Sequence, residues 1–301
     1  MLNTPLPAIP DLEDNALPQN LPRVIDAHVH LFPDELFAAV RQWFETYGWP
    51  IRYKLGSEAI LSFLFERGVS HIIGLQYAHK PGVARRLNRY MASLCARHDR
   101  LTGMATVYPG EPDARNILVE GFNMGLKGVK LHAHVQCFDM LSKSMKAIYR
   151  ACSDHGRPLI IHAGREPKSP AYPCDPYLIC QSGFVREVLR DYPDLRICVP
   201  HLGADEFEDY ARMLEQFDNL WLDTTMMLAG YLPCSGIPKL LDLRPDRIMF
   251  GTDFPNLPYA WDREIKRLAE ISLPQTLLSK FLHENALEFF KIHLDPAANL
   301  G

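Results

Sequence analysis

The stretch "VIDAHVHLFP", residues 24–33, begins as an apolar strand and ends on two histidines, His28 and His30, that are one residue apart. Side chains alternate between the two faces of a strand, so residues i and i+2 point the same way. Two imidazoles are therefore directed at one place where the strand ends. Neutral imidazole is the commonest protein ligand for metals. An isolated H-x-H pattern is nevertheless frequent by chance, so the rest of the chain has to decide.

Seven further apolar runs follow this one along the chain. They are rich in β-branched residues and lack clean polar alternation, which is typical of strands buried on both faces. Helical patterns lie between them, with apolar residues three and four apart. Alternating strands and helices predict a parallel sheet with right-handed crossovers, and eight such units in about 250 residues fit an α/β fold of the (β/α)8 TIM-barrel type. A doubly wound open sheet is the alternative, but no G-x-G-x-x-G follows the first strand. The predicted strands are residues 24–28, 71–77, 101–109, 128–134, 158–164, 196–203, 220–225 and 247–255.

The chain has 301 residues, 47% of them hydrophobic, which is enough for one large domain. We predict an extended, proline-rich N-terminal arm over residues 1–22 and a single barrel domain over residues 23–301. Two segments exceed a minimal barrel, namely residues 31–55 after the first strand and residues 165–181 after the fifth. Both would rise from the C-terminal rim, where barrel enzymes bind substrate.

The first insertion, residues 31–55, is predicted to contain a short helix from Asp34 to Tyr47. It also carries an aromatic cluster that we interpret either as packing or as substrate contact. The cluster comprises Trp43, Phe44, Tyr47, Trp49 and Tyr53.

Composition excludes several classes of partner. The net charge is −4 and no basic run indicates nucleic acid. The apolar runs are too short for a membrane span, and the N-terminus lacks the basic start and apolar region of a secretory signal. The seven cysteines form no C-x-x-C pair, and their odd number favours reduced thiols. We therefore predict a cytoplasmic protein that acts on a small molecule and binds neither nucleic acid nor membrane, with a homo-oligomer left open.

Polar side chains recur where the predicted strands end. The C-terminal ends of barrel strands meet at one mouth, so these side chains are expected to converge. Burying several polar groups together costs free energy unless something satisfies them, and a divalent cation would do so. Nitrogen and carboxylate donors without thiolate suit Zn2+, with Mn2+, Fe2+ or Co2+ as alternatives. These polar residues are His28, His30, Lys130, His132, His134, His162, His201 and Asp253.

The ordered motifs resemble those of the amidohydrolase superfamily. The likeness rests on D-x-H-x-H after the first strand, "IIHAG" at the fifth, H-x-G after the sixth and "FGTDFP" at the eighth. "GVKLH" and "ENALEFF" resemble in particular the branch that contains aminocarboxymuconate-semialdehyde decarboxylase, and the likeness spans about residues 24–291. The resemblance implies one metal ion held by His28, His30, His162 and Asp253, with His201 as the catalytic histidine.

We predict that this metal site hydrolyses a small carbonyl compound, that is an amide, ester or lactone. A metal lowers the pKa of its bound water towards about 7. Asp253 can accept the proton of that water, and His201 can polarise the carbonyl or move a proton. One alternative is the non-oxidative decarboxylation of an unsaturated or aromatic acid, because both chemistries share barrel and ligands. A second alternative is an inactive barrel that serves as a binding subunit.

Several further residues have open roles. Lys130 is interpreted either as an ammonium paired with a carboxylate, which we favour, or as a carboxylated bridge between two metal ions. His132 and His134 are predicted to contact the substrate, to support the ligands or to add one. Arg165 follows the fifth strand and is predicted to bind a substrate carboxylate through its fork, with a surface ion pair as the alternative. Cys174 and Cys180, in the second insertion, are interpreted as loosely packed thiols in a reducing compartment, with a bond or a metal site as the alternatives.

Overall fold

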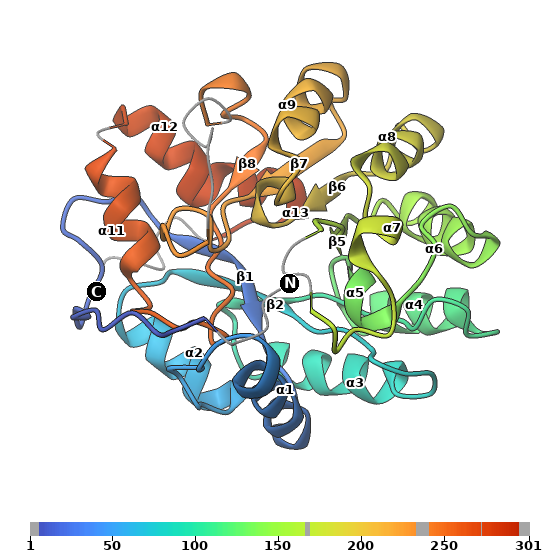
Figure 1. The fold of residues 1–301 in the computed structure, drawn as a ribbon, viewed down its shortest axis with the longest axis horizontal. Coiled ribbons are helices and arrows are strands. Elements are labelled where there is room, and N and C mark those ends of the chain that lie inside the picture. Colours follow the sequence, from blue (N-terminus) through green and yellow to red (C-terminus); the bar gives the residue numbers. More distant parts are fainter. Residues whose placement is uncertain (1–5, 166–168, 233–240, 272, 295–301) are drawn as a thin grey trace.

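The computed structural model describes residues 6–165, 169–232, 241–271 and 273–294. Within these ranges strands alternate with helices, and every paired strand runs parallel to its neighbour. Figure 1 shows the helices arranged around the strands, as the predicted barrel requires. The described strands are β1 (Ile25–His30), β2 (His71–Leu75), β3 (Leu101–Gly103), β4 (Val129–His132), β5 (Leu159–His162), β6 (Ile197–Val199), β7 (Leu220–Asp223) and β8 (Ile248–Met249).

The strands follow one another around the barrel in sequence order. Hydrogen bonding divides those described into a sheet of order β1-β2-β3 and a sheet of order β4-β5-β6-β7-β8. Two isolated parallel bridges, Ala105–Val129 and Val29–Phe254, join the sheets at their two seams. At the second seam the backbone N–H of His30 donates to the carbonyl oxygen of Phe254 at 2.8 Å. The predicted TIM-barrel order is therefore confirmed.

Amphipathic helices cover the outside of the barrel. In α3 (Ala84–Cys95), Leu87, Met91 and Leu94 recur three or four residues apart and all are buried, so one apolar stripe faces the strands. The other helices that follow strands have the same character. They are α2 (Ser57–Glu66), α4 (Ala114–Asn123), α6 (Lys143–Asp154), α8 (Ser182–Asp191), α9 (Phe207–Gln216) and α11 (Arg263–Glu270), with α12 (Gln275–Ser279), the π-helical turn η2 (Lys280–Glu284) and α13 (Asn285–Phe290) after them.

Apolar side chains fill the end of the barrel at which the strands begin. Ile25, Ile73 and Ile160 are buried there in one cluster with Trp221. Phe289 of α13 closes that end, with its ring centroid 5.4 Å from that of Trp221. Polar residues of the strands are consequently gathered at the opposite end, where the strands finish.

Two predicted strands are much longer than the observed ones. The strand predicted at 101–109 stops at Gly103, and the one predicted at 247–255 stops at Met249. Beyond each stop the backbone pairs with a neighbouring strand through isolated bridges, Ala105 with Val129 and Phe254 with Val29, and side chains take up other backbone groups. The N–H of Thr106, for example, donates to Oδ1 of Asn88 at 2.8 Å.

The strand predicted at 128–134 is also shorter in the structure, so the site residue His134 lies outside it. The short helix α5 (Ala133–Gln136) begins directly after β4. Oε1 of Gln136 accepts a hydrogen bond of 2.8 Å from the backbone N–H of His132, and this bond turns the chain out of the sheet. His134 therefore lies on a helix, and the prediction that it alternates with Lys130 along a strand is wrong.

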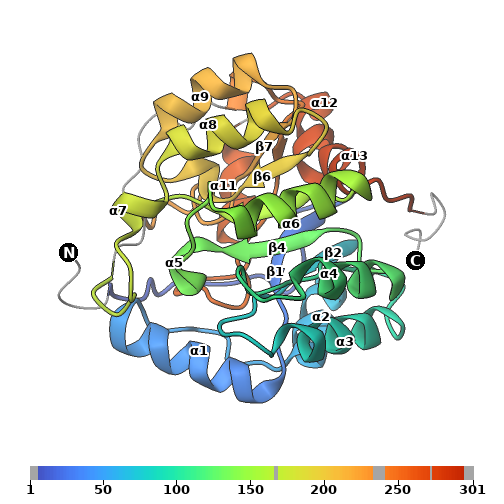
Figure 2. The same cartoon turned by 90° about the vertical axis from the view of Figure 1, so that its right-hand side faces the viewer.

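Both predicted rim insertions are present. Helix α1 (Asp34–Tyr47) has the predicted bounds, and the second insertion contains α7 (Pro176–Ile179). Figure 2 shows the loop before α7 running down towards α1. The rings of Trp43 and Tyr172 lie 5.0 Å apart, so the two insertions touch. Residues 166–168 of the second insertion lie outside the described residues.

The predicted N-terminal arm contains no helix or strand in residues 6–22. Its backbone donates from Leu6 to Gly48 and from Ile9 to Pro258, so it lies over the loops that follow β1 and β8. Residues 1–5 and 295–301 of the predicted domains lie outside the described residues. Over the described ranges, no helix combines the length and the apolar character that crossing a bilayer requires.

Candidate metal centre and active site

The polar residues predicted from the sequence meet at the C-terminal end of the barrel. A small cavity of about 40 Å³ lies there, bordered by β1, β4 and β5 and by the loops after β6 and β8. Its polar lining includes His30, Lys130, His132, His162, His201 and Asp253.

His28, His30 and Asp253 form the first of two groups that are able to hold a metal ion. Nε2 of His30 lies 2.8 Å, and Nε2 of His28 3.6 Å, from the same Asp253 oxygen. Zinc binds imidazole nitrogen and carboxylate oxygen at about 2.0–2.2 Å, which separates neighbouring ligand atoms by about 3–3.5 Å. All three residues are buried, and Nδ1 of His30 has no partner among the described groups. The donor atoms of this group therefore fit a divalent ion.

Asp223, the last residue of β7, orients the first group from behind. It accepts hydrogen bonds from Nδ1 of His28 at 2.9 Å and from the backbone N–H of His201 at 3.1 Å. Because Nδ1 of His28 donates, its free lone pair is on Nε2, which faces Asp253. Burial and the nearby Lys130 charge lower the pKa of His28 to about 3. The ring is therefore neutral at neutral pH, which is the form that binds metals.

Asp26 ties β1 to the loop after β8. Its carboxylate accepts from the N–H of His28 at 3.1 Å, and from the N–H and Oγ1 of Thr252 at 3.1 and 2.6 Å. Gly251 is needed beside it, because a Cβ there would lie 2.8 Å from Cβ of His28. The motif "FGTDFP" thus places Asp253 next to the histidines through a carboxylate that does not itself join the metal group.

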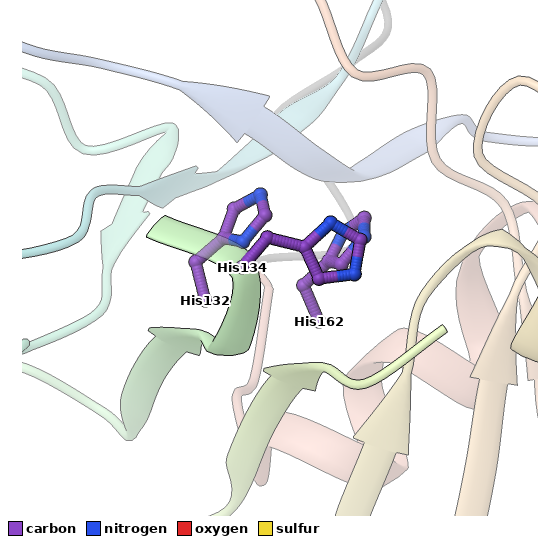
Figure 3. A group of neighbouring side chains, drawn as sticks. All are labelled: His132, His134 and His162. Carbon is purple, nitrogen blue, oxygen red and sulfur yellow. The ribbon is translucent and has the colours of Figure 1, made fainter. Parts of the chain in front are cut away.

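The second group able to hold a metal ion comprises His132, His134 and His162, whose rings are drawn in Figure 3. The rings of His132 and His162 stack with centroids 4.1 Å apart, and His134 packs edge-on at 4.7 Å from His162. Nε2 of His134 donates to the carbonyl oxygen of Gly164 at 2.7 Å. Burial is the main cause that lowers the pKa of all three rings, so they are neutral at neutral pH.

His162 therefore stands between the two groups. It belongs by distance to the second group, but it borders the small cavity together with His30 and Asp253. Its Nε2 is buried and has no partner among the described groups. Three of the four ligands implied by the family resemblance form one group, and the joint binding of a single ion by all four stays a prediction.

Lys130 is completely buried, and its Nζ lies 3.2 Å from Nε2 of His28. Burial lowers its pKa to about 8, against the attraction of Asp223 and Asp253. The favoured interpretation is an ammonium paired with a carboxylate, but the hydrogen-bonding neighbour in the structure is an imidazole of the first group. An ammonium at this distance contacts the same Nε2 that a metal ion would use, so the two compete for it. A carboxylated Lys130 that bridges two ions stays an untested prediction.

His201 and Asp253, the predicted catalytic residues, both have left-handed backbones, with φ of +58° and +76°. Such a conformation costs free energy in a non-glycine residue and is concentrated at functional sites. Nδ1 of His201 lies 3.0 Å from the carbonyl oxygen of Thr225 and donates to it, so Nε2 is free. Burial lowers the pKa of His201. The residue can therefore accept a proton at neutral pH.

The charge of Asp253 is maintained by its neighbours. Burial alone would raise its pKa, but attraction and hydrogen bonding by His30 outweigh it, so the pKa lies below its usual value. The side chain is therefore an ionised carboxylate at neutral pH, as a metal ligand has to be.

Arg165 follows β5 as predicted, but it does not border either of the cavities at the barrel mouth. Its Nη2 lies 2.9 Å from Asp205, its Nε lies 3.4 Å from Glu206, and the guanidinium lies 5.0 Å from the ring centre of Tyr177. These contacts match the ion-pair alternative. Binding of a substrate anion by Arg165 stays a prediction.

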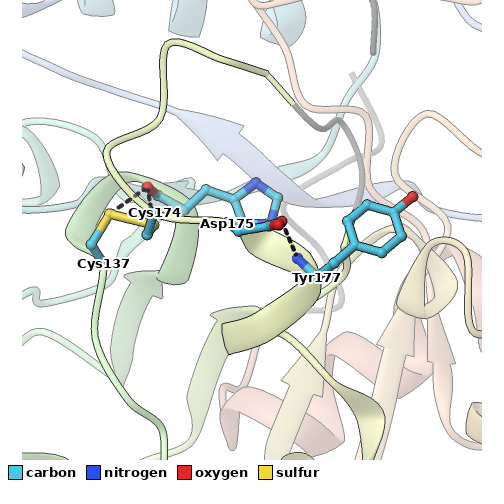
Figure 4. The surroundings of a disulfide bond; sticks show 5 residues. Cys137, Cys174, Asp175 and Tyr177 are labelled. Carbon is cyan, nitrogen blue, oxygen red and sulfur yellow. Dashed lines mark hydrogen bonds between the residues drawn. A yellow bond between two sulfur atoms is a disulfide. The ribbon is translucent and has the colours of Figure 1, made fainter.

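A disulfide between Cys137 and Cys174 joins the end of α5 to the loop before α7, as Figure 4 shows. The two residues are 37 positions apart in sequence, and their Cα atoms lie 5.8 Å apart, within the usual range for a disulfide. The expectation of reduced thiols, and of a loosely packed Cys174, is wrong for this pair. Cys180, later in the same insertion, is free and buried.

Aromatic side chains are the part of the site that the sequence left open or missed. Phe44 and Trp49, from the predicted cluster, border the small cavity, and so do Tyr77 and Tyr172, which we did not predict. Asp223, which lies in the predicted strand 220–225, orients His28. The signal for Asp223 was present in "LWLDTT", because it ends an apolar strand as the ligand histidines do.

Comparison with known proteins identifies a family. A family model described as "Amidohydrolase" matches residues 25–292. No curated protein matches the chain at a significant level.

Solved structures with the same fold include two decarboxylases. One is 5-carboxyvanillate decarboxylase from Novosphingobium aromaticivorans, complexed with manganese and 4-hydroxy-3-methoxy-5-nitrobenzoic acid; it is 18% identical, with a TM-score of 0.66, and the match covers 94% of this chain and 100% of that one. The other is 2,6-dihydroxybenzoate decarboxylase from Rhizobium, which is 18% identical, with a TM-score of 0.65 and coverage of 89% and 98%.

A third solved structure is that of a hydrolase. The probable 2-pyrone-4,6-dicarboxylic acid hydrolase from Acinetobacter baumannii is 19% identical, with a TM-score of 0.63, and the match covers 90% of this chain and 100% of that one. At these identities the likeness establishes the fold, and the chemistry has to be argued from the site.

Proposed function

Because this chain belongs to the amidohydrolase family, whose model covers residues 25–292, we propose that it is a metal-dependent decarboxylase that removes carbon dioxide from an unsaturated or aromatic acid without oxidation. The observation that carries the proposal is the setting of the ligand group: His30 and Asp253 face a small buried cavity walled by Phe44, Trp49 and Tyr172. Flat rings pack well against flat rings. Loss of carbon dioxide also disperses the charge of a carboxylate, which a site with little water favours.

This proposal reverses the ranking of the two reactions, hydrolysis and decarboxylation, that was predicted from the sequence. Hydrolysis came first there, with metal-activated water as the attacking group. The ligand motifs do not distinguish the two reactions, since they specify what holds the metal and not what faces the substrate. Two of the three solved structures named above are decarboxylases, and the aromatic cavity walls add support. Hydrolysis remains the second candidate, supported by the third structure.

His28, His30, His162 and Asp253 would hold the metal ion. When bound, the ion supplies a fixed positive charge that holds the substrate carboxylate and withdraws electron density from the carbon skeleton. The nitrogen and carboxylate donors suit Zn2+ and equally Mn2+, Fe2+ or Co2+, and one neighbour is a manganese complex. Zinc stays the prediction, and elemental analysis of purified protein tests it.

His201 would move the proton. In a decarboxylation the electron pair of the broken carbon–carbon bond stays on the substrate carbon, so a proton has to reach that carbon as carbon dioxide leaves. Nε2 of His201 is free because Nδ1 is engaged with Thr225. The neutral ring takes a proton from an acidic hydroxyl of the substrate or from solvent and passes it to the carbon.

Product analysis in heavy water tests the proposal. Metal-loaded protein is incubated with 2,6-dihydroxybenzoate, 5-carboxyvanillate and 2-pyrone-4,6-dicarboxylate. We expect carbon dioxide from at least one aromatic acid, with one deuterium at the vacated carbon, and no such product from His201→Asn. Ring opening of the pyrone without carbon dioxide from any acid would instead establish the hydrolase.

The remaining sequence predictions on partners and location stay predictions. A cytoplasmic location has to accommodate the Cys137–Cys174 disulfide, since disulfides are rare in reducing compartments. A homo-oligomer is likewise left to a measurement of mass in solution.

A further inference from the structure

A larger cavity of about 280 Å³ adjoins the small cavity at the barrel mouth. We call it the apolar chamber. The two rim insertions and the short helix after β4 supply most of its wall. The wall residues used below are Leu36, Val40 and Trp43 of α1, Val135 of α5, and Tyr172 of the loop before α7.

The apolar chamber shares part of its wall with the small cavity at the metal site. Phe44, Tyr77, His132 and Tyr172 border both cavities. Tyr172 is positioned between them by ring contacts, with centroids 5.0 Å from His134 on one side and 5.0 Å from Trp43 on the other. A molecule held at the metal site can therefore extend past Tyr172 into the chamber.

The small cavity cannot enclose a whole acid. Its 40 Å³ is little more than the share of one water molecule in the liquid, about 30 Å³. It has room for the reacting group beside the metal ligands, so the rest of the substrate has to lie elsewhere. The chamber is the adjoining space, and its 280 Å³ corresponds on the same scale to about nine heavy atoms.

The wall of the chamber carries no formal charge. Among the described residues that border it there is no lysine, arginine, aspartate or glutamate, and its polar side-chain groups are two tyrosine hydroxyls, the indole N–H of Trp43 and the rings of His79 and His132. Leu36, Val40 and Trp43 recur three or four residues apart on α1 and are only half-buried. An apolar helix face that lines a cavity and is not fully covered by protein gains most from an apolar occupant.

We propose that the apolar chamber binds an uncharged hydrophobic group of the substrate, so that the substrate is a monocarboxylic acid with an alkyl or aryl extension of up to about nine heavy atoms. The identification of the reacting carboxylate rests on the proposed function. A second carboxylate is disfavoured in the chamber, since burying an unpaired charge is costly. This separates the chain from the hydrolase of 2-pyrone-4,6-dicarboxylic acid among its structural neighbours.

A binding series on the metal-loaded protein tests the proposal without turnover. The probes are benzoate, 4-butylbenzoate and terephthalate, which is similar in length but carries a second charge, and calorimetry measures each Kd. A buried methylene tightens binding by up to about fourfold. We therefore expect 4-butylbenzoate to bind about tenfold or more tighter than benzoate, and terephthalate to bind more weakly than 4-butylbenzoate.

Matched variants on α1 locate the effect. Ala38 and Ala39 are both exposed, but only Ala39 borders the chamber. Ala39→Phe fills the chamber and should abolish the gain from the butyl group, whereas Ala38→Phe should keep it. Trp43→Ala enlarges the chamber and should shift the best binder from 4-butylbenzoate to 4-hexylbenzoate. Melting temperatures establish that each variant is folded.

The outcomes separate this proposal from the proposed function. No gain from the butyl group, equal binding of terephthalate and 4-butylbenzoate, or equal effects of Ala38→Phe and Ala39→Phe would each overturn the apolar chamber as a substrate site. Preference for the butyl group with no carbon dioxide from any acid would support the chamber and contradict decarboxylation. Carbon dioxide release with no preference for extended acids would support decarboxylation and contradict the chamber as a substrate site.

Discussion

Histidines lie on two sides of the barrel mouth, and the groups that surround them differ between the two sides. On the β1 and β8 side, His28 and His30 contact the carboxylates of Asp223 and Asp253 at 2.9 and 2.8 Å. These carboxylates set the direction of the imidazole lone pairs and make the position attractive to a cation. This side has the arrangement of a metal ligand set.

On the β4 and β5 side the histidines have no carboxylate among their described hydrogen-bond partners. His132 and His162 stack on one another, and His134 donates to a backbone carbonyl. Of these rings His132 borders the apolar chamber, whereas His162 borders the small cavity and stays a predicted metal ligand. The difference teaches that a histidine at a strand end takes its setting from its neighbours: carboxylates orient His28 and His30, whereas His132 packs against rings and forms part of the chamber wall.

The largest effect is expected from Asp253→Asn, which removes the charge from the first side. We expect loss of the bound ion and a fall in kcat/KM of about 1000-fold or more. Elemental analysis should find about one divalent ion per wild-type chain, while His132→Asn, on the other side, should retain it. Equal loss of metal from both variants would contradict the difference between the two sides of the mouth. About two ions per wild-type chain would favour a carboxylated Lys130 that bridges them.

His201→Asn comes next. Because we assign His201 to proton transfer, the variant should keep the metal and lose about 100- to 10,000-fold in kcat. Metal content and turnover are measured on the same preparation. If the variant bound no metal, His201 would be a ligand and our assignment would be wrong.

Asp223→Asn should weaken metal binding without abolishing it. The amide no longer holds the Nδ1–H tautomer of His28 electrostatically, so we expect affinity to fall about 10- to 100-fold. Competition with a chelator measures it. Asp218→Asn is the control, because Asp218 is a highly exposed carboxylate that pairs with Arg244 away from the site; a similar loss there would remove Asp223 from the site.

The histidines on the β4 and β5 side should make the stability of the metal-free protein fall at acid pH. Burial lowers the pKa of His134 to about 4, whereas an unfolded histidine titrates near 6.5. Between these values the unfolded chain binds more protons, so stability is present above pH 6.5 and is lost as the pH falls, by about 1.4 kcal/mol per pH unit for this one group.

Urea unfolding of metal-free protein at pH 7 and pH 5 measures this sensitivity. His134→Gln should reduce the difference in unfolding free energy between the two pH values by about 2 kcal/mol. An unchanged difference in His134→Gln would mean that this ring is not held neutral by its surroundings.

The smallest effect is expected from Arg165→Ala. Since Asp205 and Glu206 already pair with the guanidinium, we expect KM for an acid substrate to change by less than about threefold. A role in binding the substrate carboxylate would instead cost about 30- to 1000-fold in kcat/KM for the acid, and little for its methyl ester. That result would move Arg165 into the site and add a cationic group to the β4 and β5 side.

Much of the fold and part of the site could be predicted from the sequence, because the signals are local. Buried parallel strands appear as short apolar runs, and a ligand at a strand end is recognisable from the strand before it, as with His162 in "IIHAG". The α1 bounds were also predicted correctly, since the spacing of apolar residues defines a helix without reference to the rest of the chain. Strand ends were predicted less well, because Asn88 and Gln136 terminate strands through side-chain hydrogen bonds that no pattern of hydropathy contains.

What the sequence by itself determined is therefore the kind of atoms at the barrel mouth: imidazole nitrogens, carboxylates and one lysine at the ends of apolar strands. Only the tertiary structure decided what each of them faces. His28 meets a carboxylate 195 positions away, Cys174 meets Cys137, and α1 meets the loop before α7 to enclose the apolar chamber. The physical reason is that a residue's chemistry belongs to its side chain, whereas its pKa, its tautomer and the space beside it depend on neighbours that only folding brings close.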